Sequence, residues 1–182
     1  MSPTRRDLLR AAVPAAAIAV AGCGFRSRDG PATGAQADPD LVRFRNPGAD
    51  AVLETVDGEE GPIGPVFRRR PRSVTFAPGV PERDREAARA FLDGTDFETA
   101  SILVETVYPA SCERYSLDRV TWGPEGVETV SCFGWRPPDE ACEAERRDAL
   151  GLFVRLPTTL DGVPTDGAGS TTSGCSPDPV DW

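Results

Sequence analysis

Helical periodicity is confined to one short segment of the chain, and this restriction does most to limit the fold. The segment begins at Pro81, carries Glu82 and Asp84 at the positive end of the helix dipole, and ends at Gly94. Its apolar residues fall on one face, namely Ala87, Ala88, Phe91 and Leu92. We therefore predict a single helix near residues 82–92 that packs against a sheet.

The other apolar segments are short, and in most of them apolar and polar residues alternate, as is typical of half-buried strands. Glycine, proline or aspartate residues end them. We predict strands over 41–45, 51–56, 101–108, 114–122, 127–135 and 150–156, and the segments 66–67 and 72–77 are candidates for a further short strand. Six to seven strands with one appended helix indicate a mainly β fold, either a small β-sandwich or a partly open barrel.

One strand changes its phase along its length. Tyr115 and Leu117 share one face, whereas Val120 and Trp122 share the opposite face. This change predicts a β-bulge near Arg119, within a hairpin formed by residues 114–122 and 127–135.

The N-terminal residues have the pattern of an export signal. Arg5 and Arg6 are followed by Leu8 and Leu9, which resembles the twin-arginine motif. The apolar run that follows, residues 11–21, is weakly hydrophobic and much shorter than the about 20 residues of a spanning helix. We predict export of the folded protein by the twin-arginine route, with an ordinary secretory signal as the alternative.

The end of this leader predicts a membrane anchor. Val20-Ala21-Gly22-Cys23 resembles a lipobox, in which small residues precede a cysteine that takes a lipid. We divide the chain into a signal peptide, a lipidated flexible tether, one β-rich domain and a Gly/Ser/Thr-rich tail; the bounds are 1–22, 23–40, 41–160 and 161–182.

The charged residues indicate a salt-adapted protein and exclude several chemistries. The chain has no lysine and no histidine, and residues 23–182 hold 28 acidic residues and 17 arginines, a net charge of −11. The whole resembles twin-arginine-exported lipoproteins of haloarchaea, whereas an acidic protein from an arginine-biased genome is the alternative. Acidity argues against a nucleic-acid partner. The missing residue types exclude histidine triads, imidazole zinc sites and Schiff-base catalysis, and we predict no cofactor and no metal.

The four cysteines that follow Cys23 predict two disulfides, because an even number outside the membrane indicates pairing. We favour Cys112–Cys142 with Cys132–Cys175, since the hairpin places Cys112 near the loop that carries Cys142. The other pairings and a four-thiolate metal site are the alternatives.

Residues 97–157 resemble the C-terminal β-domain of protease-complex subunits found on secreted bacterial proteins. The residues that carry the resemblance are Tyr115, Leu117, Val120 and the segment from Phe153 to Pro157. This resemblance implies an accessory or inhibitory subunit of a surface protease.

Three groups of side chains are candidates for binding or catalysis. The arginine run Arg68, Arg69, Arg70 and Arg72 would contact anionic lipid, glycan acids or an acidic partner, or would simply pair with nearby carboxylates. Trp122 and Trp135, with Tyr108, would line a sugar platform or belong to the core. The acidic residues of the loop 136–148 would serve glycoside hydrolysis or form surface salt bridges; they are Asp139, Glu140, Glu143, Glu145 and Asp148.

From these features we predict a lipoprotein on the outer, extracellular face of the cytoplasmic membrane. It would be a non-enzymatic binding or accessory module, anchored through Cys23, with a protein or glycan of the cell surface as its partner. A protease subunit is the first alternative and a carboxylate-dependent glycoside hydrolase the second.

Overall fold

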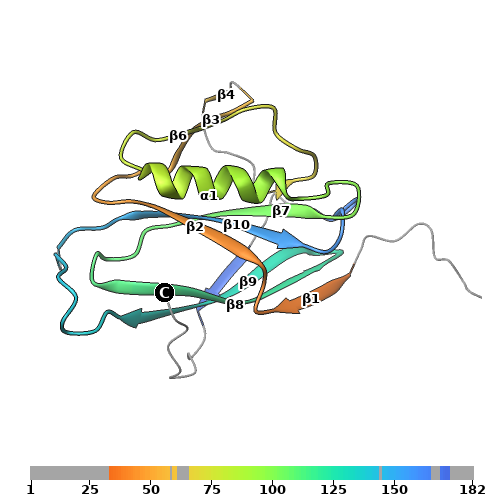
Figure 1. Cartoon of the computed structure of the whole chain (residues 1–182). Coiled ribbons are helices and arrows are strands. Elements are labelled where there is room, and N and C mark those ends of the chain that lie inside the picture. The colour runs from red at the N-terminus through yellow and green to blue at the C-terminus, as the bar shows by residue number, and fades with distance from the viewer. Residues whose placement is uncertain (1–32, 58, 61–65, 144, 165–168, 173–182) are drawn as a thin grey trace, which may run out of the picture.

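Two four-stranded sheets lie face to face, and a helix and a small third sheet cover one of them (Figure 1). This computed structural model describes residues 33–57, 59–60, 66–143, 145–164 and 169–172. The predicted signal peptide, Cys23 and Cys175 lie outside the described residues. The mainly β fold with one helix is confirmed.

Sheet A has the strand order β1-β8-β9-β11 and is antiparallel except for β11, which runs parallel to β9. Its strands are β1 (Gly34–Ala37), β8 (Glu113–Gly123), β9 (Gly126–Trp135) and β11 (Gly169–Thr172). Sheet B is antiparallel, with the order β2-β10-β7-β5. Its strands are β2 (Leu41–Asn46), β10 (Ala149–Leu156), β7 (Ser101–Val107) and β5 (Val66–Phe67).

The third sheet, sheet C, has the order β4-β3-β6 and lies on the same side of sheet B as the helix α1 (Figure 1). Its strands are β4 (Glu59–Glu60), β3 (Leu53–Val56) and β6 (Val74–Phe76), and α1 spans Glu82–Asp93. The structure thus has more strands than the sequence predicts. The additional ones are short, and their residues lack the alternation that marks the long strands.

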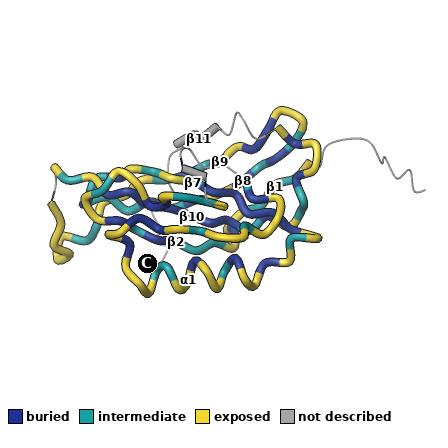
Figure 2. Tube along the Cα trace, turned by 90° about the horizontal axis from the view of Figure 1, so that it is seen from above, coloured by how far each residue is buried: buried dark blue, intermediate teal, exposed yellow. Residues whose placement is uncertain are grey.

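Sheet B lies in the middle because both of its faces are covered. Side chains of β10 alternate between two cores: Leu152 and Val154 pack towards sheet A, and Phe153 packs towards α1 and sheet C. Every residue of β10 except Arg155 is therefore buried, and Figure 2 shows β10 inside the molecule. This double burial explains the nearly continuous apolar sequence of β10.

The helix forms where the sequence predicts it. Ala88 and Leu92 are buried against sheet B, and Phe91 is half-buried beneath the guanidinium of Arg155, 4.4 Å from the ring centroid. Ala87 is exposed, so the buried face is narrower than predicted. No helix in the described part of the chain is long and apolar enough to cross a membrane.

The predicted β-bulge is confirmed. The pairing of β8 with β9 shifts its register between Leu117 and Arg119. Tyr115, Leu117, Val120 and Trp122 are all buried, because the extra residue returns the second half of β8 to the core face.

The ordered domain begins earlier and ends later than the sequence predicts. Residues 34–37, which we assigned to a flexible tether, form β1 and pair with β8 over Arg119–Trp122. Val163 is buried, and β11 joins β9, so part of the predicted tail belongs to the domain. The reason is the same at both ends: small or polar residues obtain their order from backbone pairing with a neighbouring strand, which leaves no apolar pattern in the sequence.

The predicted Cys112–Cys142 disulfide is present, with the two Cα atoms 5.1 Å apart. Cys132 is disulfide-bonded as well. Its predicted partner, Cys175, lies outside the described residues.

Candidate functional site

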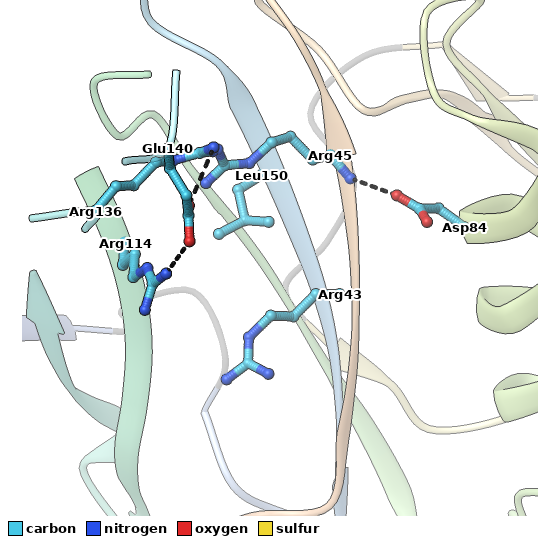
Figure 3. A pocket seen from close by; sticks show the side chains of 7 residues that line it. All are labelled: Arg43, Arg45, Asp84, Arg114, Arg136, Glu140 and Leu150. Atoms are coloured by element: carbon cyan, nitrogen blue, oxygen red, sulfur yellow. Dashed lines mark hydrogen bonds and ion pairs between the residues drawn. The ribbon is translucent and has the colours of Figure 1, made fainter. Parts of the chain in front are cut away.

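Four arginines, from β2, from β8 and from the residue after β9, converge on one cavity (Figure 3). The cavity has a volume of about 460 Å³ and is lined by Arg43, Arg45, Asp84, Arg114, Arg136, Glu140 and Leu150. The lining residues carry four positive and two negative charges, although the whole chain carries a net charge of −9. We call this feature the arginine cavity.

The alternation of β2 places two of these arginines on one wall. Phe44 packs into the core beneath α1, so Arg43 and Arg45 lie on the opposite face of this edge strand. Arg45 pairs in register with Leu150 of β10, which supplies the apolar part of the lining. Figure 3 shows Arg43 extending from β2 towards the interior of the cavity.

A buried carboxylate holds Arg45 in place. Asp148 is only 2% exposed, and its Oδ2 lies 3.3 Å from Nη1 of Arg45. The other oxygen of Asp148 accepts hydrogen bonds from the backbone N–H of Gly48, at 2.9 Å, and from Nε of Arg146, at 3.3 Å. The backbone N–H of Arg45 also donates to Asp84 of α1, at 3.4 Å. The side chain of Arg45 is thus oriented by Asp148, which is itself held by Gly48 and Arg146.

The positive charges of the cavity are brought together at an electrostatic cost. Burial lowers the pKa of Arg43. Burial also lowers the pKa of Arg45, and the positive charge of Arg136 lowers it further, against the opposing effect of Asp148. An anion in the cavity would offset the desolvation penalty of these guanidinium groups and reduce their mutual repulsion.

The second wall comes from the hairpin and the loop that follows it. Arg114 lies near the start of β8, and Arg136 directly follows β9. The carboxylate of Glu140 contacts both: Oε1 pairs with Nη2 of Arg114, and Oε2 lies 3.9 Å from Nη1 of Arg136. The Cys112–Cys142 disulfide clamps this wall, because each cysteine is two residues from one of the paired side chains.

A polar network lies behind the cavity, between the two large sheets. Leu152 pairs with Arg43 on one side and with Glu105 on the other, so these side chains share the face of sheet B that packs on sheet A. Glu105 accepts hydrogen bonds from the hydroxyls of Tyr115, at 2.9 Å, and Thr129, at 3.3 Å. Burial raises the pKa of Glu105 despite these bonds, and it also raises the pKa of Tyr115.

The predicted arginine run lies elsewhere and does not line the cavity. All four of its side chains belong to exposed residues. Arg70 pairs with Asp93 at the end of α1, and Nη2 of Arg68 donates to the carbonyl of Val163. The alternative of an exposed run that pairs with nearby carboxylates therefore describes Arg70, whereas Arg68 contacts a backbone carbonyl.

The two tryptophans differ. Trp122 is 8% exposed and packs in the core, so the core alternative holds for it and its ring does not line a sugar platform. A Cβ atom at Gly34 would lie 2.4 Å from the indole, which shows how closely β1 covers this ring. Trp135 is 77% exposed at the end of β9, next to Arg136, and stays a candidate for ligand contact.

The acidic residues of the loop 136–148 divide between surface pairs and structural roles. Glu143 pairs with Arg146 at 2.8 Å, as expected of surface salt bridges. Asp148 is buried and Glu140 lines the cavity, which the sequence did not predict. Among the described residues, no cluster of acidic or cysteine side chains is arranged to hold a metal ion.

Sequence reasoning missed all four arginines of the cavity. Two of them did carry a signal, because Leu41-Val-Arg-Phe-Arg45 places two arginines on one face of a strand predicted to be half-buried. The other two, Arg114 and Arg136, carry no local signal, since only the pairing of β8 with β9 brings them together.

Comparison with protein-family models, curated proteins and solved structures finds no match to this chain. The geometry and charge of the arginine cavity are therefore the features that indicate a function.

Proposed function

We propose that this protein is a surface-anchored lipoprotein that acts as a non-enzymatic binding module, and that the arginine cavity binds its anionic ligand. The observation that carries the proposal is the convergence of four arginines on one cavity in a chain of net charge −9. The leader, with Arg5, Arg6 and Cys23, supports a position at the outer face of the membrane.

The size and lining of the cavity support a small ligand or the terminal group of a larger one. Its volume of about 460 Å³ lies within the range of small-molecule sites. Guanidinium groups present a rigid fork of N–H donors that matches carboxylates, sulfates and phosphates. Leu150 adds an apolar contact for the carbon skeleton of the ligand.

The arrangement favours direct contact over long-range attraction. In molar salt, charges are screened beyond about 3 Å, so a net positive patch attracts little from a distance. Hydrogen-bonded ion pairs in a partly enclosed cavity are screened less. The side chains of Arg45, Arg114 and Arg136 are 20–25% exposed, which suits such a contact site.

The lining also favours binding over hydrolysis. Two carboxylates, Asp84 and Glu140, line the cavity, and a glycoside hydrolase would need such a pair. Asp84 accepts a hydrogen bond from the backbone N–H of Arg45, and Glu140 forms ion pairs with Arg114 and Arg136. Both are thus engaged with donors of the protein itself.

The proposal is tested by isothermal titration of the full chain, in high salt, with acetate, succinate, galacturonate, sulfate and phosphate. We expect at least one of these anions to bind and Arg43→Gln or Arg136→Gln to weaken its binding about tenfold or more. Arg69→Gln removes an equal charge from an exposed site outside the cavity and is the matched control. The absence of binding, or an equal loss in the control, would overturn the proposal.

The anchoring is tested separately by mass spectrometry of the mature protein from native membranes. We expect a diacylglyceryl or related lipid on Cys23 and no residues before it. An unmodified Cys23 would remove the anchor and leave the binding proposal untouched.

A further inference from the structure

We infer that the ligand of the arginine cavity carries a carboxylate, and that Glu140 occupies the subsite for this carboxylate in the unliganded protein. The inference rests on the proposed binding function and specifies its ligand class. Glu140 is a carboxylate that already contacts two arginines of the cavity.

Glu140 contacts these arginines as a ligand carboxylate would. Its Oε1 pairs with Arg114, which comes from β8, and its Oε2 lies 3.9 Å from Arg136, which follows β9. Figure 3 shows the side chain of Glu140 reaching both from the loop above the cavity. Two oxygens therefore contact two separate guanidinium groups, and a two-oxygen, planar anion fits this arrangement.

The exposure of Glu140 indicates that it can leave. Its side chain is 43% exposed, whereas those of Arg114 and Arg136 are 20% and 25% exposed. The carboxylate thus lies at the mouth, with the arginines beneath it. Because exposed ion pairs contribute little to stability, a ligand carboxylate can replace this one at low cost.

Asp148 shows the opposite arrangement within the same site. It is 2% exposed and accepts from Arg45, Arg146 and the backbone N–H of Gly48. Its removal would leave buried donors without an acceptor, so it belongs to the framework. Asp148 is therefore a structural carboxylate, whereas Glu140 only occupies the subsite.

The backbone at both arginines is held by contacts that do not involve Glu140. Arg114 lies within the β8–β9 hairpin, where it pairs with Gly134. The backbone N–H of Arg136 donates to the carbonyl of Cys112 at 2.9 Å, and Cys112 is bonded to Cys142. Glu140 belongs to a turn closed by its own N–H and the carbonyl of Pro137, at 3.0 Å. The turn can therefore move as a unit between Arg136 and Cys142, which are both held by bonds to Cys112.

The experiment compares Glu140→Gln with the wild-type full chain by isothermal titration with acetate, succinate, galacturonate, sulfate and phosphate. We expect the carboxylates to bind the wild type more tightly than sulfate and phosphate do. We expect Glu140→Gln to bind the carboxylates about fivefold more tightly than the wild type, because the competing group is gone. Glu143→Gln removes an equal charge from the same loop outside the cavity, and we expect it to leave affinity unchanged.

The outcomes separate this inference from the proposed function. Weaker carboxylate binding by Glu140→Gln, in a protein that still binds, would make Glu140 a positioning residue and overturn the inference alone. If the wild type bound sulfate or phosphate more tightly than the carboxylates, the assignment of a carboxylate ligand would be wrong, while the proposed binding function would stand. No binding by either protein would remove the proposed function.

Discussion

The hydroxyl of Tyr115 donates a 2.9 Å hydrogen bond to the carboxyl of Glu105 and joins the two large sheets across the core. Tyr115 comes from β8 of sheet A and Glu105 from β7 of sheet B. Oε2 of Glu105 is buried without a hydrogen bond in the described part of the chain. A carboxyl in this position is stabilised in its protonated form, because burial penalises the charge.

This burial predicts a pH dependence of stability that arises from Glu105. Since burial raises its pKa in the folded state, the folded protein binds this proton more strongly than the unfolded chain. The resulting stabilisation is complete below the unfolded pKa, about 4.3, and is lost as the pH rises through the folded value. We therefore expect the stability of the wild type relative to Glu105→Gln to fall between pH 4 and pH 8.

Urea unfolding of both proteins over this pH range, in constant salt, measures the difference. Glu128→Gln removes an exposed carboxyl from β9 and controls for the loss of one charge. A wild-type advantage that rises with pH would contradict the assignment.

Asp148→Asn is expected to destabilise the fold by about 3–5 kcal/mol, because it weakens a buried acceptor that serves Arg45, Arg146 and Gly48. Glu143→Gln, which loses one exposed partner of Arg146, is expected to change stability by less than about 0.5 kcal/mol. Denaturant midpoints at neutral pH compare the two variants. Equal losses of stability in the two variants would show that the burial of Asp148 does not determine how much it contributes to the stability of the fold.

Removal of the Cys112–Cys142 disulfide is expected to affect both stability and binding. The bond closes a loop between residues 30 positions apart, and the double Cys→Ser variant is expected to lose about 2–4 kcal/mol. Because this bond clamps the wall that carries Arg114 and Arg136, carboxylate affinity should fall as well. Titration at a temperature where the variant is still folded separates the two effects, and unchanged affinity there would show that the wall holds its geometry without the bond.

Gly34→Ala tests whether β1 belongs to the domain. A Cβ atom at this position would lie 2.4 Å from the indole of Trp122, a rigid and buried side chain. We expect a loss of about 1–3 kcal/mol by overpacking, with a change in the fluorescence of the tryptophan. Gly134→Ala, where a Cβ atom would meet nothing within 4 Å, is the control. A neutral Gly34→Ala would indicate that residue 34 lies in a tether after all.

The features that the sequence predicted well depend on neighbours along the chain. The helix follows from Pro81, Gly94 and the apolar face between them, and its observed span is Glu82–Asp93. The bulge follows from the change of phase between Leu117 and Val120 within one strand. The Cys112–Cys142 disulfide follows from the hairpin, whose register brings the two segments together.

The cavity was not predicted because its walls come from distant parts of the chain. Arg43 and Arg45 belong to β2, Arg114 to β8, and Arg136 follows β9. The arginine run at Arg68–Arg72 was the strongest local signal, yet it lies on an exposed segment. Density of charge in the sequence was therefore a poor guide to density of charge in space.

The mainly β class, the position of the helix, the bulge and one disulfide could be predicted from the sequence, because periodicity, turn residues and hairpin spacing act over short distances. Three features depend instead on contacts in the folded molecule: residues 34–37 join a sheet, Trp122 is buried, and four arginines line one cavity. These properties arise when two sheets pack. Packing selects which faces meet, and that selection depends on contacts between strands far apart in the chain.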